Sequence, residues 1–151
     1  MKKLAIYLLA LCLFLGLAAC NENPAEPQTA AFYLPNEDAD GFVVKEGLTD
    51  GKAEDLVALL VAEGALPEGC ALLSFDLDNA TADMNAAYGR AISNTGTAGE
   101  YMLLGSLANT LLIFFGLDEI AVTVEGQHIE TGHEIYDYPL RFFENQIAVI
   151  E

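Results

Sequence analysis

Basic side chains are scarce in this sequence, which has six lysine and arginine residues against 23 aspartate and glutamate residues. The formal charge at pH 7 is −17. A surface this acidic repels the phosphates of nucleic acids and the headgroups of anionic lipids, so the composition excludes binding to either by charge. Any attachment to a membrane must therefore use something other than surface charge.

Cysteine is also rare, with Cys12, Cys20 and Cys70 the three positions. Cys12 lies in a segment that we expect to be removed, and Cys20 lies where a lipid would be attached. Cys70 then has no intramolecular partner, so the mature chain should contain no disulfide. Because Cys70 lies at the edge of an apolar run, we expect a small core residue rather than a nucleophile.

The usual signatures of nucleophilic and phosphate chemistry are missing. Ser74, Ser93 and Ser106 do not lie in the G-x-S-x-G setting of a nucleophile elbow. No glycine-rich loop follows a predicted strand and opens a helix with a lysine, so the sequence predicts no phosphate cradle. We expect no catalytic residue and no bound cofactor.

Two histidines are the most tempting metal ligands. His128 and His133 stand five residues apart, with Glu125, Glu130 and Glu134 around them. Zinc proteases of the H-E-x-x-H type place two histidines four apart on a helix, whereas this segment reads as strand and loop. We therefore expect solvated hairpin residues.

An acidic stretch could indicate calcium, with candidate ligands Asp76, Asp78, Asn79, Asp83 and Asn85. Aligned with an EF-hand loop that starts at Asp76, the sixth position is Thr81 rather than glycine and the twelfth is Ala87 rather than glutamate. The solvent face of a strand explains the pattern more simply. The sequence predicts no metal site.

The N-terminus has the features of a lipoprotein signal. Lys2 and Lys3 precede the uncharged apolar stretch 4–17, which is shorter than the roughly 20 residues of a membrane-spanning helix. Leu17-Ala18-Ala19-Cys20 then places two small residues before a cysteine. These features predict a signal peptide over residues 1–19 and lipidation of Cys20. Lipid anchoring needs a durable attachment, which two acyl chains on one residue provide.

The remaining chain is long enough for one domain. Residues 20–29 contain two prolines and no large apolar side chain, and they predict a tether. Residues 30–140 predict the folded domain, and residues 141–151 a C-terminal tail. Without residues 1–19 the chain has four basic and 23 acidic side chains, a formal charge of −19.

Hydrophobic periodicity predicts the elements of this domain. We expect strands at residues 30–34 and 42–44, then a helix over 53–63 that is capped by Asp50 or Thr49 and stopped by Gly64. Residues 71–77 and 81–85 predict a hairpin.

A second helix should begin at a capping box formed by Thr97 and Glu100, and it should end at Gly116. A last hairpin, 120–124 with 127–129, turns at Glu125-Gly126. The order predicts an α+β fold with two helices packed on one face of a mixed sheet.

Several segments resemble the GerMN domain of sporulation and spore-germination lipoproteins. They are the polar-apolar run 106–111, the strand-turn 120–126, Glu130-Thr131-Gly132-His133, Pro139-Leu140 and, upstream, Phe32-Tyr33-Leu34-Pro35. The hairpin 71–85 resembles the central hairpin of that domain, so the resemblance covers about 30–140. Within the run, Asn109 is expected to tie its helix to neighbouring backbone.

The resemblance implies a non-catalytic, lipid-anchored binding or scaffolding domain of the cell envelope, in sporulation or germination. It would lie on the extracytoplasmic face of the cell membrane, held by the lipid on Cys20. Its partner would be an envelope protein or a cell-wall component. The alternative is a secreted hydrolase or metal-dependent enzyme without a recognisable motif. The sequence leaves the oligomeric state open.

The anchoring hypothesis predicts that Cys20→Ser blocks lipidation and processing, because no other thiol lies at a cleavage site. Intact-mass measurement of the membrane fraction should show a diacylglyceryl addition on residue 20 of the wild-type chain. A mature chain that starts elsewhere, or that has an unmodified Cys20, would contradict the hypothesis.

Overall fold

The computed structural model describes residues 26–145, which form an α+β domain. The signal peptide and Cys20 lie outside the described residues, as does most of the tether. In chain order the elements are β1 (Gln28–Pro35), β2 (Phe42–Thr49), α2 (Ala53–Ala62), β3 (Leu72–Asp76), β4 (Thr81–Met84), α3 (Ala86–Ser93), α4 (Thr97–Phe115), β5 (Ala121–Val124), β6 (Gln127–Glu130) and β7 (Ile135–Tyr136).

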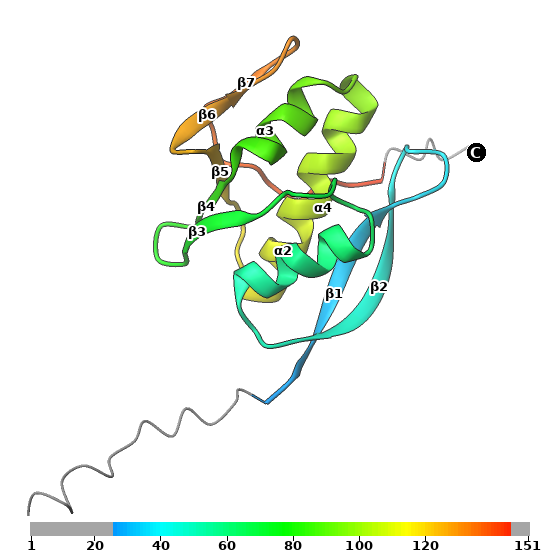
Figure 1. Ribbon diagram of the computed structural model, residues 1–151. Helices are drawn as coiled ribbons and strands as arrows, with labels where there is room; N and C mark the ends of the chain where they lie inside the picture. The colour runs from blue at the N-terminus through cyan, green and yellow to red at the C-terminus, as the bar shows by residue number, and fades with distance from the viewer. Residues whose placement is uncertain (1–25, 146–151) are drawn as a thin grey trace, which may run out of the picture.

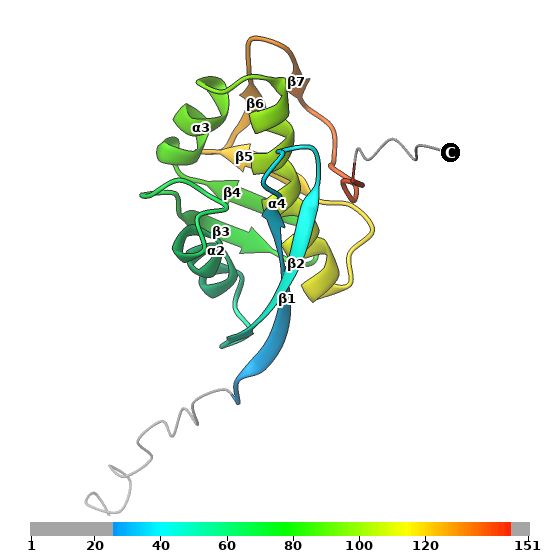
Figure 2. The same ribbon diagram turned by 90° about the vertical axis from the view of Figure 1, so that its right-hand side faces the viewer.

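The helices lie between two sheets (Figures 1 and 2). One sheet has five strands in the order β3-β4-β5-β6-β7, and the other is the antiparallel pair β1-β2. The larger sheet is mixed because β4 and β5 are parallel while its other pairs are antiparallel. The predicted α+β class and mixed sheet are confirmed, with three helices in the described part rather than two.

Helix α4 forms the centre of the core. Its buried residues fall on every side of the helix, because one part of its surface meets the β1-β2 pair and another meets α2 and α3. It is the one helix of residues 26–145 long and apolar enough to cross a bilayer, but 61% of its apolar window is buried inside the domain. A core helix enclosed by other elements is expected to be as apolar as a membrane-spanning helix.

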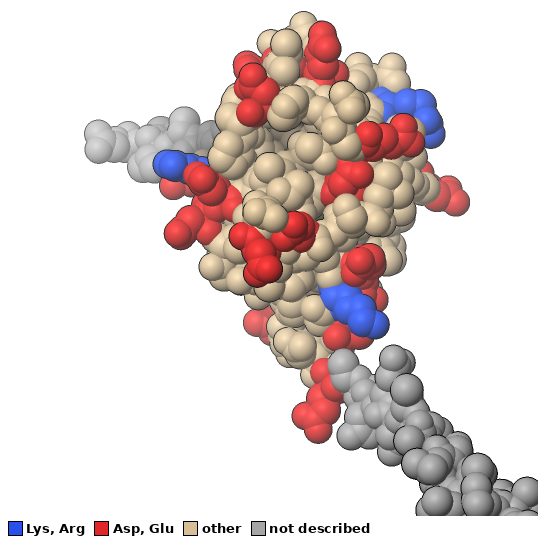
Figure 3. All heavy atoms as spheres, turned by 90° about the vertical axis from the view of Figure 1, so that its left-hand side faces the viewer, with Lys and Arg blue, Asp and Glu red and all other residues tan. Residues whose placement is uncertain are grey.

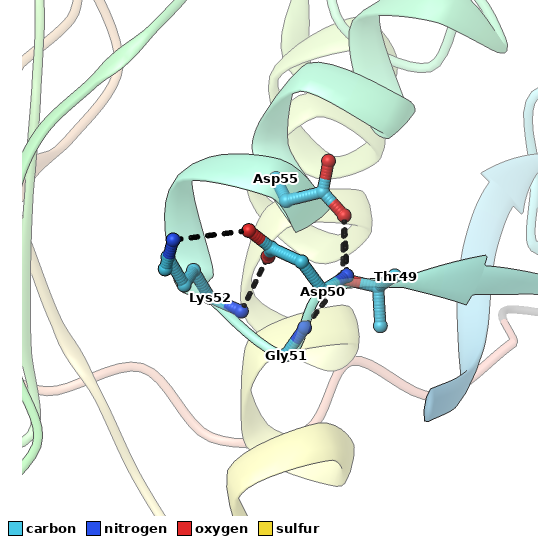
Figure 4. Close-up of polar contacts among 5 residues, drawn as sticks. All are labelled: Thr49, Asp50, Gly51, Lys52 and Asp55. Carbon is cyan, nitrogen blue, oxygen red and sulfur yellow. Dashed lines mark hydrogen bonds and ion pairs between the residues drawn. The ribbon is translucent and has the colours of Figure 1, made fainter. Parts of the chain in front are cut away.

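The start of α2 differs from the predicted cap. The N-cap residue is Lys52, and its side chain makes no capping hydrogen bond. Instead Asp55 Oδ2 accepts hydrogen bonds from the Thr49 hydroxyl (2.7 Å) and the Asp50 amide (3.0 Å), while Asp50 Oδ1 accepts from the Lys52 amide (Figure 4). The predicted residues hold the turn before the helix, and a carboxylate inside the first turn completes it.

The capping box predicted for α4 is wrong by one residue. Gly96 is the N-cap, Thr97 is the first helical residue, and no side chain caps the helix. Glycine has no side-chain oxygen to offer an amide of the first turn, so the box cannot close. The carboxylate of Glu100 is free to turn inward instead, and it is buried.

Helix α3 was not predicted from the sequence. Its sequence signal is an N-cap at Asn85, whose side chain accepts from the Tyr88 amide, and the buried pair Tyr88 and Ile92 one turn apart. Gly89 weakens the pattern because glycine disfavours helix. The structure explains this glycine, since a Cβ at position 89 would lie 2.9 Å from Val124 Cγ1 of β5.

The predicted turns are confirmed. Glu125 and Gly126 have φ of +50° and +74°, as a two-residue hairpin of type I′ requires. Gly64 follows α2 and Gly116 ends α4, and both glycines have left-handed backbone conformations. The hairpin β3-β4 has the expected antiparallel pairing around Leu77–Ala80.

Residues 141–145 lie against the domain rather than apart from it, although the sequence analysis assigned them to a tail. The Phe42 amide donates to Asn145 Oδ1 (2.7 Å), and Tyr101 donates its hydroxyl to the Glu144 carbonyl (2.6 Å). Just upstream, Leu140 exchanges backbone hydrogen bonds with Ile120. This segment therefore covers one end of α4.

The packing of α4 under the β1-β2 pair predicts that Gly105→Ala destabilises the fold. A Cβ at position 105 would lie 2.1 Å from Cζ of the buried Phe42 ring. We expect a net loss of about 1–3 kcal/mol in unfolding free energy, despite the better helix propensity of alanine.

Urea unfolding measures this loss. Gly132→Ala is the matched control, because nothing lies within 4 Å of its added Cβ, and it should stay within about 0.5 kcal/mol of wild type. Equal stability of the two variants would show that Phe42 does not pack closely on α4.

Candidate functional site

The outer face of the five-stranded sheet is acidic (Figure 3). Two of its carboxylates, those of Asp76 and Asp83, accept hydrogen bonds that hold local structure. Asp83 Oδ1 accepts from the Thr123 hydroxyl (2.7 Å) and from the Gly126 amide (2.8 Å), and so it joins β4 to the β5-β6 turn. This carboxylate therefore has a structural role in the sheet.

Asp76, the first of the calcium candidates, has a similar role in the β3-β4 turn. Its two oxygens accept from the amide and the side chain of Asn79, at 3.0 and 2.7 Å. The Asn79 side chain and amide hold the pKa of the Asp76 carboxyl below its usual range. Both carboxylate oxygens are thus engaged in closing the turn.

The two histidines face different hollows. His128, on β6, lines one together with Arg90 and Ser93 of α3, whereas His133 lines another in the loop between β6 and β7. Among residues 26–145, no three His, Cys, Asp or Glu side chains are grouped so that they could hold a metal ion. The two histidines therefore do not share a hollow among the described residues.

A buried carboxylate lies where α4 meets the β6-β7 hairpin. Glu100 is 3% exposed, and its Oε1 accepts from the Tyr136 hydroxyl and from the Thr131 hydroxyl (3.3 Å). The Thr131 hydroxyl in turn accepts from the amides of His133 and Glu134. Glu100 thereby links the core helix to the loop that contains His133.

The second oxygen of this carboxylate, Oε2, is buried without a hydrogen-bond partner among the described residues. A buried carboxylate oxygen without a hydrogen bond lowers the stability of the fold. The two hydroxyl donors at Oε1 are therefore needed to stabilise this carboxylate. Burial and the Glu100 carboxylate raise the pKa of Tyr136 above its usual range, since both disfavour the phenolate.

Aromatic side chains surround the hollow next to this cluster. The hollow has a volume of about 550 Å³ and is lined by Tyr101, Tyr136, Tyr138 and the segment 139–143. Tyr136 and Tyr138 have ring centroids 5.9 Å apart, and Tyr101 meets Phe143 edge-on at 4.9 Å. Such rings present large apolar faces with polar tips, as protein-binding surfaces commonly do.

Another hollow, of about 760 Å³, lies between α3, α4 and the two loops at the ends of α2 and β1. Small and apolar residues such as Pro35, Gly64 and Met102 form much of its lining, with Arg90 and Asn94 at the side of α3. Asn94 is engaged, because its side chain donates to the Arg90 carbonyl (2.7 Å). The groove can hold apolar groups.

Two polar residues of α4 form hydrogen bonds with the backbone of segments that lie beside this helix. Asn109 donates to the Phe143 carbonyl and accepts from the Phe143 amide, both at 2.8 Å, which confirms its predicted tie to backbone. Thr110 Oγ1 accepts from the Tyr33 amide of β1 (3.1 Å). The two adjacent residues thus hold two different segments to one helix.

Cys70 is a core residue, as predicted. It is buried and free, and burial raises the pKa of its thiol. A thiol that is buried and reluctant to ionise is a poor nucleophile.

The Glu100 cluster predicts how stability depends on alkaline pH. In the unfolded chain Tyr136 loses its proton near pH 10, whereas folding raises that pKa. The unfolded state then binds fewer protons above about pH 10, so the contribution of Tyr136 is full below that pH and is lost as the pH rises further.

We therefore expect Tyr136→Phe to flatten part of the fall in unfolding free energy above about pH 10, and to cost about 1–3 kcal/mol at pH 7 because Glu100 loses a donor. Urea unfolding across this range measures both effects. Tyr33→Phe is the control, since no hydrogen bond of its hydroxyl is present within residues 26–145. An unchanged pH profile in Tyr136→Phe would contradict the assignment.

Comparison with solved structures identifies two similar chains. The tandem GerMN domains of the sporulation protein GerM from Bacillus subtilis share 21% sequence identity with a TM-score of 0.50, and the match covers 83% of this chain and 48% of that one. A lipoprotein candidate from Clostridium perfringens shares 21% identity with a TM-score of 0.45, covering 76% of this chain and 87% of that one.

The chain thus spans about half of the tandem-domain structure, and at this identity the likeness concerns the fold. Comparison with curated proteins gave no match. A family model named Germane and described as "Sporulation and spore germination" matches residues 31–130, which is most of the described domain. The chain therefore belongs to the Germane family of sporulation and spore germination.

Proposed function

We propose that this chain is a lipid-anchored, non-catalytic binding domain on the extracytoplasmic face of the cell membrane, where it holds an envelope protein during sporulation or germination. The observation that carries the proposal is the family match over residues 31–130. The sequence at Leu17-Ala18-Ala19-Cys20 supports the anchor, since it has the small residues and the thiol that lipoprotein processing needs.

The placement of reactive side chains supports binding rather than catalysis. The acidic residues Asp76 and Asp83 are used by turns, Cys70 is buried, and the histidines lie in separate hollows. The surface instead has two concave regions lined by apolar and aromatic side chains. One is the hollow beside Tyr136 and Tyr138, and the other is the groove beside α3. Concave surfaces lined by apolar side chains are the usual sites at which proteins bind other molecules.

Charge supports a basic partner. Residues 26–145 contain four basic and 21 acidic side chains, and three of the four bases form ion pairs with carboxylates of the domain: Lys45 with Glu63, Lys52 with Asp50 and Arg141 with Glu119. Most of the carboxylates of the domain therefore have no basic side chain beside them, and its surface is strongly negative. Complementary charge steers association and is screened by salt.

The exposed acidic loop between β1 and β2 predicts a salt-sensitive interaction. Pull-down with the full chain should recover less partner as ionic strength rises from about 0.01 to about 0.15 M, because the screening length falls from about 30 to about 8 Å. Neutral variants at Glu37, Asp38 and Asp40 (Asn or Gln) should weaken capture at low salt and reduce this dependence.

Neutral variants at three exposed carboxylates away from this loop serve as the control for net charge: Asp78 in the β3-β4 turn, Glu125 in the β5-β6 turn and Asp118 between α4 and β5. Equal losses in both sets would show that total charge, and not the loop, attracts the partner. If the purified chain instead hydrolyses a cell-wall or ester substrate with no partner present, the enzyme alternative takes the place of the binding domain.

A further inference from the structure

Within residues 26–145, no strand pairs with the outer edge of strand β2 beyond Phe42, whose amide is bonded to Asn145. The strand pairs with β1 on one side and is the outer strand of a two-stranded sheet. Figure 1 shows β2 along the outer margin of the domain, with the helices on the far side of β1. Its eight residues, Phe42–Thr49, make it one of the two longest strands of the described chain.

The direction of the backbone groups follows from the pairing. Asn36 donates to the Gly41 carbonyl, so the hydrogen-bonded pairs of this hairpin continue through Leu34–Val43 and Phe32–Lys45. The residues between them point their amides away from the ladder. Two observed bonds agree, because the Tyr33 amide donates to Thr110 and the Phe42 amide donates to Asn145.

The same alternation directs the amides and carbonyls of Val44, Glu46 and Leu48 toward the open edge. These backbone groups have no hydrogen-bond partner elsewhere in residues 26–145. They form a row of three donors and three acceptors at the spacing of a β ladder. An added strand is the structure that satisfies such a row.

Apolar side chains flank this edge on both faces. Val44 is 57% exposed and Leu48 66% exposed on one face, and Val43 is 52% exposed on the other. At the end of the strand Val44 also borders a hollow of about 240 Å³, together with Tyr33, Phe42 and Phe142. An added strand would cover these side chains and place one of its own in the hollow.

The other sheet edges are less suited to an added strand. The outer edge of β1 faces α4 through the Tyr33–Thr110 bond. Strand β3 is interrupted by a register shift between Leu72 and Ser74, and β7 has two residues. Bulges and short strands are the ordinary means of closing an edge, whereas β2 is long and regular.

We infer that β2 is a docking edge for an extended, basic segment of a partner protein, which pairs with Val44, Glu46 and Leu48 as a third strand. The inference rests on the proposed function and names its contact surface. Charge favours a basic segment, since Glu46 lies on the edge and the domain has 21 acidic side chains in residues 26–145. Lys45, the one basic side chain of the strand, is paired with Glu63 at 2.6 Å.

A second copy of this chain fits the edge poorly. Antiparallel pairing of two such edges that sets Val44 opposite Leu48 also sets Glu46 opposite its own copy, and like charges placed opposite each other destabilise a ladder. It would also bring together two chains that each have a net charge of −17. A basic partner segment avoids both penalties.

The test uses the full chain in detergent and a short synthetic peptide in which lysine and valine alternate. Glu46→Pro removes the outward amide of residue 46 but no bond of the β1-β2 ladder, because that amide faces away from β1. Glu46→Gln is the matched control, as it makes a similar change in charge and keeps the amide. Fluorescence anisotropy gives the dissociation constants.

We expect Glu46→Pro to weaken peptide binding by about tenfold or more, equivalent to about 1.4 kcal/mol, and Glu46→Gln to weaken it less than about threefold. On the wild-type chain, hydrogen exchange should slow at the amides of Val44, Glu46 and Leu48 when the peptide is added. This measurement decides the matter even if Glu46→Pro fails to fold.

Equal affinity of the two variants, or protection at β3 or β7 in place of β2, would overturn the docking edge. The same holds if the peptide does not bind the wild-type chain. These results leave the proposed function standing, since a partner could then be held at the aromatic hollow. Hydrolysis of a substrate would remove the proposed function itself.

Discussion

The burial of α4 on all sides between Leu104 and Leu112 is the constraint on which the rest of this fold depends. A helix whose apolar residues are spread around its circumference cannot rest on one sheet with its back to water. Helices α2 and α3 enclose one side together with Phe75 and Tyr136 of the five-stranded sheet, and the β1-β2 pair encloses another. Residues 141–145 close the end near Tyr101. The two sheets are parts of one domain because they share this helix.

Enclosing the helix in this way removes its buried polar residues from water, and most of them have a hydrogen-bond partner in the protein, the Ser106 hydroxyl and Glu100 Oε2 being without one among the described residues. Asn109 and Thr110 solve the problem by bonding the backbones of Phe143 and Tyr33, which are segments far apart in sequence. Glu100 does so through the hydroxyls of Tyr136 and Thr131. The polar groups of the core thus specify which segments lie beside α4, whereas apolar contacts would accept many arrangements.

This division also explains what could be predicted from the sequence. The Glu125-Gly126 turn, the stop at Gly116 and the tie made by Asn109 follow from local chemistry, and the structure confirms them. Helix α3 and the inward turn of Glu100 depend on neighbours distant in sequence. Gly89 weakens a helix signal because β5 needs the space, and no local pattern reveals that Tyr136 will meet Glu100.

The same architecture separates the core from the surface that can meet a partner. Strand β1 makes most of the contacts between this pair and α4, and β2 adds Phe42 at its first residue, so the rest of β2 is held in place without being covered by residues 26–145. An edge strand of this kind would ordinarily risk aggregation, and the charged side chains of the strand, Lys45 and Glu46, act against it. Repulsion between chains of net charge −17 supplies a second protection. The negative charge of this edge repels a second copy of the chain and attracts a basic segment. Charge alone therefore distinguishes between these two partners, before the fit of their side chains is considered.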